Sequence, residues 1–421
     1  AGNSIISVAS AVGASKGDAG VGGTIAVNLL LNTVQSEITN SNASSTAIPS
    51  TVTIKAVNAN TIYSVGGAIG ASKKAGVGIA IAFNFIQPTV KALILDSQLD
   101  IGEINNSATL DASTLTISAI DSSEIYAISA GGAGAEKIAV AGGISVNIIL
   151  SDVQAYIAGT TTFIRATGDI IVSALGTNKI YALSGNAAGA GKVAVGAALS
   201  YNQNESKVFA YISGATIESI NGNILIDALT TGEMIAISAG GAFSGKVAVD
   251  GSVVIGVLNN EIRAYVDNSA KLTAAGSISI SAADTISAVL VAGVAGGAES
   301  AAVGVSNSTF VSHNEVLAYT GSNVFVKGKG KKAVVKTLGA DLVTPGNWKE
   351  INHRGVFVNA VSDHAVRIFA AGGLGAGTVA VAASGTVSVI NDTIKAFIGE
   401  TSTVEASNDD SEDDLSKPNN A

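Results

Sequence analysis

The chain of 421 residues contains no cysteine. Disulfide bonds, cysteine-ligated metal centres and thiol nucleophiles are therefore excluded. Proline is almost absent, and we expect its few copies to avoid hydrogen-bonded strands, because proline cannot donate to a strand ladder. The four prolines are Pro49, Pro88, Pro345 and Pro418, and all of them lie outside the repeated strand motifs of the sequence.

Charge is scarce as well. Charged residues make up 13% of the chain, whereas roughly a quarter is usual for a globular domain. The net charge of −9 argues against a nucleic-acid partner. About half of this charge comes from the C-terminal segment 407–421, which we expect to be an acidic flexible tail. Its acidic residues are Asp409, Asp410, Glu412, Asp413 and Asp414.

Long apolar runs are also missing, although the mean hydropathy is +0.45. Gly, Ser, Asn and Lys interrupt every run before it reaches the roughly 20 apolar residues that a membrane helix needs. The first residues, 1–6, lack the basic start and apolar core of a signal peptide. We therefore expect no membrane span, and we expect the chain to begin inside a repeat, as a fragment or a processed product would.

A repeat of about 54 residues organises the sequence. It is clearest in an aliphatic-x-Ala-aromatic-aliphatic motif, as in Val208–Ile212 and Ile262–Val266. A Gly-led alternating segment, as in Gly168–Ala174, keeps the same phase. Copies of the first motif begin at Val34, Val90, Val153, Val208, Ile262, Val316 and Ile394, at successive spacings of 56, 63, 55, 54, 54 and 78 residues. Period-2 alternation and β-branched residues predict strands, and helix signals are poor.

These features predict an all-β fold, a repetitive β-solenoid of seven stacked coils with in-register parallel sheets. We expect about four strands per unit, with turns at Gly-rich runs such as Gly131–Gly134. Because such a run occurs once per unit, one large coil is favoured over two coils of about 27 residues. The small residues around it favour two closely packed sheets in a thin slab. The solenoid spans 1–406, with units at approximately 1–60, 61–123, 124–178, 179–232, 233–284, 285–363 and 364–406.

Recurring side chains predict ladders in which each residue packs on its equivalent one coil away. Asn28, Asn84, Asn147 and Asn202 share one position, which favours an asparagine ladder at a corner of the coil, and Gly256 ends it. For the aromatic positions a ladder is favoured over a ligand platform. The aromatic positions are Tyr63, Tyr126, Tyr181, Tyr156, Tyr211, Tyr265, Tyr319 and Phe397.

Two insertions interrupt the repeat. The one at 96–111 matches no calcium loop, so we expect a plain loop. The one at 327–354, in unit six, is the candidate partner-binding loop. It either contacts a polyanionic glycan or an acidic surface, or it is a solvated hairpin whose lysines prevent aggregation and whose tryptophan packs on the solenoid. The second interpretation is favoured. The residues concerned are Lys327, Lys329, Lys331, Lys332, Lys336 and Trp348.

Signatures of catalysis are absent from the sequence. No P-loop, dinucleotide fingerprint or nucleophile elbow stands in a strand-turn-helix context. His313, His353 and His364 lack the spacing of a zinc site, and we expect surface roles for them. Polysaccharide-degrading β-helix enzymes need clustered carboxylates, whereas those of residues 1–312 are scattered singly. We therefore expect no catalytic residue, metal or cofactor.

The succession Gly-Gly-x-Gly-x-x-Lys-Val-Ala-Val, a Ser-Val-Asn strand, x-Ala-Tyr-Ile-x-Gly and Gly-Asn-Ile-x-Ile-x-Ala resembles the repeats of leukotoxin-like filamentous adhesins. These adhesins are large two-partner-secreted exoproteins of Gram-negative bacteria. The resemblance is closest in units three to five and looser over nearly all of 1–406. It implies an extracellular or surface-attached filament that is exported unfolded across the outer membrane, and it implies no catalytic residues. The family's amino-terminal secretion domain is not visible, and the acidic tail departs from the repeat.

The sequence therefore predicts a non-catalytic stalk or adhesin segment of a secreted or cell-surface bacterial exoprotein, with a host or cell-surface glycan or protein as its partner. The alternative is a subunit of a surface layer or extracellular filament, assembled end to end through the strand edges of units one and seven. A polysaccharide-degrading β-helix enzyme is a minor alternative.

Overall fold

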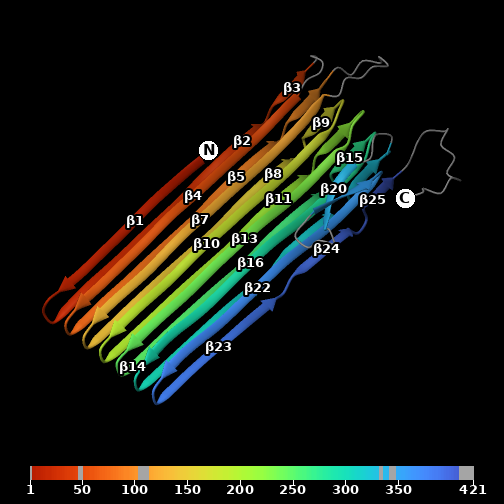
Figure 1. Ribbon diagram of the computed structural model, residues 1–421. Helices are drawn as coiled ribbons and strands as arrows, with labels where there is room; N and C mark the ends of the chain where they lie inside the picture. The colour runs from red at the N-terminus through yellow and green to blue at the C-terminus, as the bar shows by residue number, and fades with distance from the viewer. Residues whose placement is uncertain (1, 46–50, 103–112, 331–334, 341–347, 407–421) are drawn as a thin grey trace.

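The computed structural model describes residues 2–45, 51–102, 113–330, 335–340 and 348–406. In each coil the chain follows a long strand, reverses in a two- or three-residue turn, returns along a second extended segment and ends in a short strand. Seven such coils stack side by side into one continuous slab, from the first coil in red to the last in blue (Figure 1). The predicted all-β solenoid with in-register parallel sheets is confirmed.

Three parallel sheets run the length of the stack. Sheet A contains β1 (Gly2–Ser15), β4 (Thr51–Ser72), β7 (Thr114–Ala135), β10 (Ile170–Ala190), β13 (Ile224–Ser244), β16 (Ile278–Ala298) and β22 (Val356–Ala376). Sheet B contains β2 (Ala19–Thr39), β5 (Ala75–Leu95), β8 (Ile138–Ala158), β11 (Val193–Ser213), β14 (Val247–Asp267), β17 (Ala301–Ser312), β18 (Glu315–Thr320), β23 (Val379–Ile390) and β24 (Thr393–Ile398). Sheet C contains the short strands β3 (Asn42–Ser45), β6 (Gln98–Ile101), β9 (Phe163–Ala166), β12 (Thr216–Ser219), β15 (Lys271–Ala274), β19 (Phe325–Gly328) and β25 (Thr403–Ala406).

The register of the sheets shows one coil per sequence repeat. Tyr211 of β11 is the direct partner of Tyr265 of β14, with no strand between them. Their rings lie 4.8 Å apart, which is the spacing of neighbouring strands in a sheet. The prediction of one large coil is confirmed. The coils start at the sheet A strands, so the predicted unit 61–123 begins inside β4 instead of at its start.

The number of strands per coil differs from the prediction. Among the described residues, the first five coils have three strands and not four, because their sheet B strands run without interruption for 21 residues. In the last two coils the sheet B strand is split at 313–314 and at 391–392, which gives four strands. Pro88 lies inside β5, where a position outside the strand motifs was expected. The pairing of β5 with β8 skips Gln87 and Pro88, because proline has no N–H to donate.

The Gly-rich runs are strands, and the prediction of turns there is wrong. Gly131–Gly134 belongs to β7, and the chain reverses only after it, at Glu136 and Lys137. Sheet B approaches sheet A so closely at this point that a Cβ atom on Gly131 would clash with the backbone carbonyl of Gly142. Glycine therefore permits close packing here, and the predicted thin slab is confirmed.

The residue types that fill the interior change along the strands. Isoleucine, valine and alanine fill the wide end, where sheets A, B and C meet. A second apolar cluster fills the middle, and a cluster of buried alanines, against which Leu374 packs, forms the thin end near the turns. Buried polar side chains separate the first two clusters, among them Asp121, Asn178 and Asp284. Each makes at least one hydrogen bond to a neighbour in its own or an adjacent coil, which offsets part of the cost of burial.

The asparagine ladder exists, but it lies inside the slab and not at a corner. Asn28 donates to Asn84, Asn84 to Asn147 and Asn147 to Asn202, over 2.8, 2.8 and 2.9 Å. All four residues occupy the middle of sheet B strands and point inward, because they share the phase of the buried residues around them. The ladder ends as predicted at Gly256, the partner of Asn202, where Phe310 of the next coil fills the interior.

Differences in unit length are concentrated at one corner of the coil, between a sheet C strand and the next sheet A strand. The link from β9 to β10 is 167–169, whereas the link from β6 to β7 is 102–113 and the link from β19 to β22 is 329–355. The last of these carries a hairpin of β20 (Val335–Ala340) and β21 (Trp348–His353). The predicted tail, 407–421, and most of the 96–111 loop lie outside the described residues.

Candidate functional site

The aromatic ladders are confirmed, and they lie on the outer faces of the slab. On sheet A, Tyr63, Tyr126 and Tyr181 stack with ring centroids 4.9 Å apart. On sheet B the centroid separations run from 4.7 to 5.1 Å along Tyr156, Tyr211, Tyr265, Tyr319 and Phe397. Each inner ring of a ladder has a ring on both sides, so these rings expose mainly their edges and hydroxyl groups, whereas an end ring such as Phe397 stacks on one side only. Stacking on a sugar ring requires a free face, which favours a structural role for the inner rings.

Replacing Tyr211 by alanine should remove two ring stacks at once. At about 0.5–1.5 kcal/mol for each aromatic pair, we expect a loss of about 1–3 kcal/mol in the free energy of unfolding, measured by urea denaturation. Tyr201 is a matched control, because it lies on the same outer face of β11 but bonds Gln203 and stacks on no ring. Tyr201→Ala should cost clearly less. Equal losses for the two variants would contradict a stabilising ladder.

The described lysines of the candidate partner-binding loop lie on different elements. Lys327 belongs to β19, in the repeat itself, and its Nζ is 2.9 Å from the carboxylate of Glu405. The insertion therefore begins after Gly328 and not at Lys327. Lys329 follows β19, and its backbone donates to Ala274. Lys331 and Lys332 lie outside the described residues, whereas Lys336 lies in β20 and Trp348 in β21.

The hairpin lies on the outer face of sheet A. β20 packs next to β16 and β22. Ser279, Ser281 and Ala283 face outward from β16, yet they are at most 5% exposed. Their equivalents in the preceding coil, such as Leu225 and Leu229, are partly exposed. The hairpin therefore covers the start of β16.

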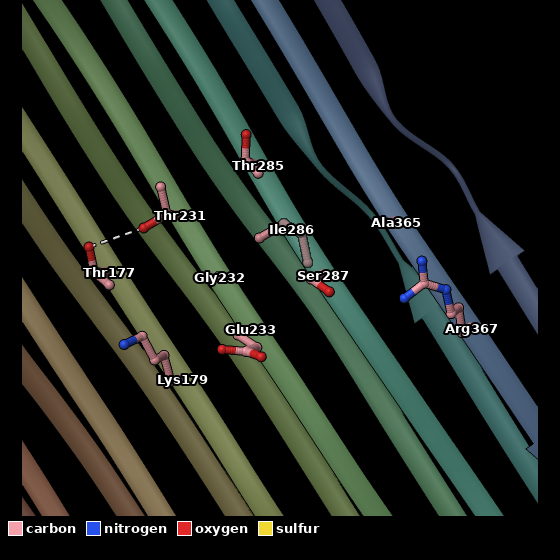
Figure 2. Close-up of a pocket in the computed structure, with 10 residues that line it drawn as sticks. All are labelled: Thr177, Lys179, Thr231, Gly232, Glu233, Thr285, Ile286, Ser287, Ala365 and Arg367. Carbon is pink, nitrogen blue, oxygen red and sulfur yellow. Dashed lines mark hydrogen bonds between the residues drawn. The ribbon is translucent and has the colours of Figure 1, made fainter. Parts of the chain in front are cut away.

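Beyond the covered part of β16, a groove of about 430 Å³ crosses the outer face of sheet A. Figure 2 shows that it extends over β10, β13, β16 and β22, so it runs along the stacking axis across four coils. The side chains that line it are mainly hydroxyl and charged groups. The lining residues are Thr177, Lys179, Thr231, Gly232, Glu233, Thr285, Ile286, Ser287, Ala365 and Arg367.

Most of the charge around the groove is already paired. The Lys179 Nζ lies 3.0 Å from the carboxylate of Glu124. Glu233 accepts a hydrogen bond of 2.6 Å from the hydroxyl of Tyr181, and burial, this bond and the charge of Glu233 raise the pKa of that tyrosine. Arg367 stands at the opposite end of the groove (Figure 2) and makes no hydrogen bond or ion pair with any described residue. One free cation therefore faces an otherwise compensated surface.

His364 is buried, and the prediction of a surface role is wrong for it. Its Nε2 lies 2.9 Å from Asp284 and its Nδ1 lies 3.0 Å from Asp392. The side chains of the three residues are 8%, 0% and 12% exposed, in that order. Ser362 and Asn314 also approach Nε2, at 3.2 and 3.4 Å. The cluster joins the last coil to the one before it.

Both ring nitrogens of His364 face carboxylate oxygens, which only accept hydrogen bonds. Burial acts to lower the pKa of His364, but the hydrogen bond that His364 donates to Asp284 and the charges of Asp284 and Asp392 outweigh it and raise the pKa above its usual value. The imidazolium form is therefore favoured. His353 behaves in the opposite way, because burial against Phe357, with ring centroids 4.2 Å apart, lowers its pKa to about 4.

Several carboxylates of the described residues are buried or bound to neighbouring side chains. Asp121, Asp250 and Asp284 are closed off between the two long sheets. On the outer face of sheet A, Glu124 and Glu233 are tied to the neighbouring lysine and tyrosines. Within the part of the chain that the structure describes, no group of three His, Asp or Glu side chains could hold a metal ion.

Comparison with known proteins gave no relative. No protein-family model, no curated protein and no solved structure matches this chain. The resemblance to filamentous adhesin repeats therefore stays a prediction. The described residues also contain no helix long and apolar enough to cross a membrane.

Sequence reasoning missed both the groove and the buried cluster. The burial of His364 could have been predicted, because in the alternating pattern of the strand it lies on the same inward face as Ala360 and Val366, which pack against the core. The groove had no comparable signal. Lys179, Glu233, Ser287 and Ala365 are separated by about 54 or more residues in the sequence and become neighbours only through the register.

Proposed function

We propose that the chain is a non-catalytic structural segment of a secreted or cell-surface adhesin, which presents its outer faces to a glycan or protein of another surface. The observation that supports it best is the single uninterrupted register of seven coils. Such a register gives two flat faces on which residues from distant parts of the sequence recur at fixed spacing. The adhesin-like repeat motifs of units three to five point to the same role.

The dimensions of the stack favour a protein that presents a broad surface over one that serves only as a spacer. Seven coils at about 4.8 Å each rise only roughly 30 Å along the stacking axis, whereas a 21-residue strand is about 70 Å long. A stalk that used about 54 residues for each 4.8 Å of length would be an inefficient spacer. A broad face is what this amount of chain provides, so the outer faces are the parts we expect to act.

A second candidate, a subunit of a filament or surface layer, is favoured by the end coils. Among the described strands, β1 pairs only with β4 and β22 only with β16, so these two strands form the edges of sheet A. Side chains of the first coil such as Ile25 and of the last coil such as Ile398 are 71% and 53% exposed. Free edges of parallel sheets can pair with another chain in the same register.

The experiment is to incubate the purified chain with a panel of immobilised glycans and matrix proteins and with the same polysaccharides in solution. We expect saturable retention on at least one surface and no release of reducing ends or unsaturated sugars. Cleavage of any polysaccharide would overturn the non-catalytic role. Light scattering of the same samples separates the two candidates, because growth into rods as concentration rises would favour the filament subunit.

A further inference from the structure

The groove on sheet A arises from small residues in one column of the outer face. Lys179, Glu233, Ser287 and Ala365 follow one another from coil to coil in direct register. The first two side chains are long, whereas serine and alanine are short. Arg367, two residues beyond Ala365 on the same face of β22, closes the far end (Figure 2). The change from long to short side chains leaves the space of about 430 Å³.

A second column forms the floor with hydroxyl groups. The hydroxyls of Thr177 and Thr231 are bonded to each other over 3.1 Å. The hydroxyl of Thr285 in this column and that of Ser287 in the first column make no hydrogen bond with described residues, so they are open to a ligand. Hydroxyl groups both donate and accept, which suits them to the hydroxyl groups of a sugar.

We propose that this groove binds an acidic sugar, with the guanidinium of Arg367 holding its carboxylate and the hydroxyls of Thr285 and Ser287 bonding its ring hydroxyls. A guanidinium binds a carboxylate through two parallel hydrogen bonds. The volume lies at the lower end of the range for small-molecule sites, roughly 300–1,000 Å³. It is therefore suited to one or two sugar rings of a longer chain that follows the stacking axis.

The charge pattern orients the ligand and limits its class. Glu233 repels an anion from the β13 end of the groove, so the carboxylate must lie at the Arg367 end. Because Lys179 is neutralised by Glu124, Arg367 is the one unpaired cation among the described residues that line the groove. A polymer with several sulfates on each unit would meet Glu233 without a compensating charge. One carboxylate for each sugar is the better match.

The proposal deepens the adhesin function and rests on it, since it names the ligand class of one outer face. The test is titration of the whole chain with a short galacturonic acid oligomer and with its neutral methyl ester, followed by calorimetry. We expect the acid to bind at least tenfold more tightly than the ester. Equal affinities would overturn the role of the carboxylate.

Two variants locate the site. Arg367→Gln should weaken binding of the acid at least tenfold and leave the weak binding of the ester unchanged. Ser287→Leu, which fills the groove, should abolish binding of both the acid and the ester. The matched control is Lys55→Gln, because Lys55 is exposed on the same outer face but outside the groove. This variant should bind the acid as tightly as the wild type does.

The outcomes separate this proposal from the adhesin function. If Arg367→Gln binds the acid as tightly as the wild type, or if the wild type binds neither oligomer, the groove is not an acidic-sugar site. The adhesin function then still depends on retention of the chain on other glycans or on matrix proteins. Circular dichroism of each variant confirms that a loss of binding is not a loss of fold, since Arg367 and Ser287 point away from the core.

Discussion

Gly131→Val should prevent the chain from forming a stable slab at its thin end. A Cβ on this residue would clash with the backbone carbonyls of Gly142 and Gly78, which belong to the opposing sheet. Backbone in a continuous ladder cannot move aside as a flexible side chain could. We expect a loss of about 3 kcal/mol or more in the free energy of unfolding, measured by urea denaturation. Because each coil depends on its neighbours, the damage should spread to adjacent coils.

Gly134→Val is the matched control, three residues along the same strand. A Cβ there has no heavy atom within 4 Å, because Gly134 faces outward. Its effect should stay within about 0.5 kcal/mol, as is usual for surface substitutions. If both variants melt at the same temperature, the close approach of sheets A and B does not exist in solution.

His364→Leu should release the last coil from the stack. The substitution leaves the buried Asp284 and the largely buried Asp392 without their shared cation. Removing one partner of a buried ion pair costs about 3–5 kcal/mol. The loss should be local, since the last coil has a neighbour on one side only. Hydrogen exchange of residues 356–406 should accelerate, while exchange in the middle coils should stay as in the wild type.

The same substitution at His313 is the control, because that side chain is exposed and makes only a 3.3 Å contact with Asn391. His313→Leu should have little effect on exchange. Comparable release of the last coil in both variants would show that the buried cluster does not hold it.

The pH dependence of the wild type follows from the same cluster. The pKa of His364 is higher in the folded protein than in the unfolded chain, so the protonated form stabilises the fold. This contribution is complete below about pH 6.5, the usual pKa of histidine, and is lost as the pH rises through the higher folded value. The wild type should therefore lose stability of the last coil on the alkaline side, and His364→Leu should not show this change.

The period of the repeat was enough to predict the fold and the register. Motifs spaced by 54 to 78 residues became direct strand partners, for example Val316 and Ile394, despite the insertion between them. The position of the turns was not predictable in the same way. Glycine is common both in turns and at close contacts between sheets, and only the opposing strand distinguishes the two at Gly131.

The alternation along a strand shows which residues share a face, but it does not show which face is inside. One residue of known burial is needed to decide that. Once Ile125 and Ala127 are known to face inward, Tyr126 must face outward, which is where its ladder lies. The groove depends on something else, namely the size of the side chains that follow one another across coils. That information exists only when the register of several coils is known together.

The corner between sheets C and A explains how this chain could change length without losing its architecture. Links of three residues and of more than twenty connect equivalent strands there, and the ladders on either side keep the same register. We therefore expect this corner to tolerate inserted peptides. A foreign peptide inserted after β12 or β15 would project from a rigid edge, and copies in successive coils would form an array with a pitch of about 4.8 Å.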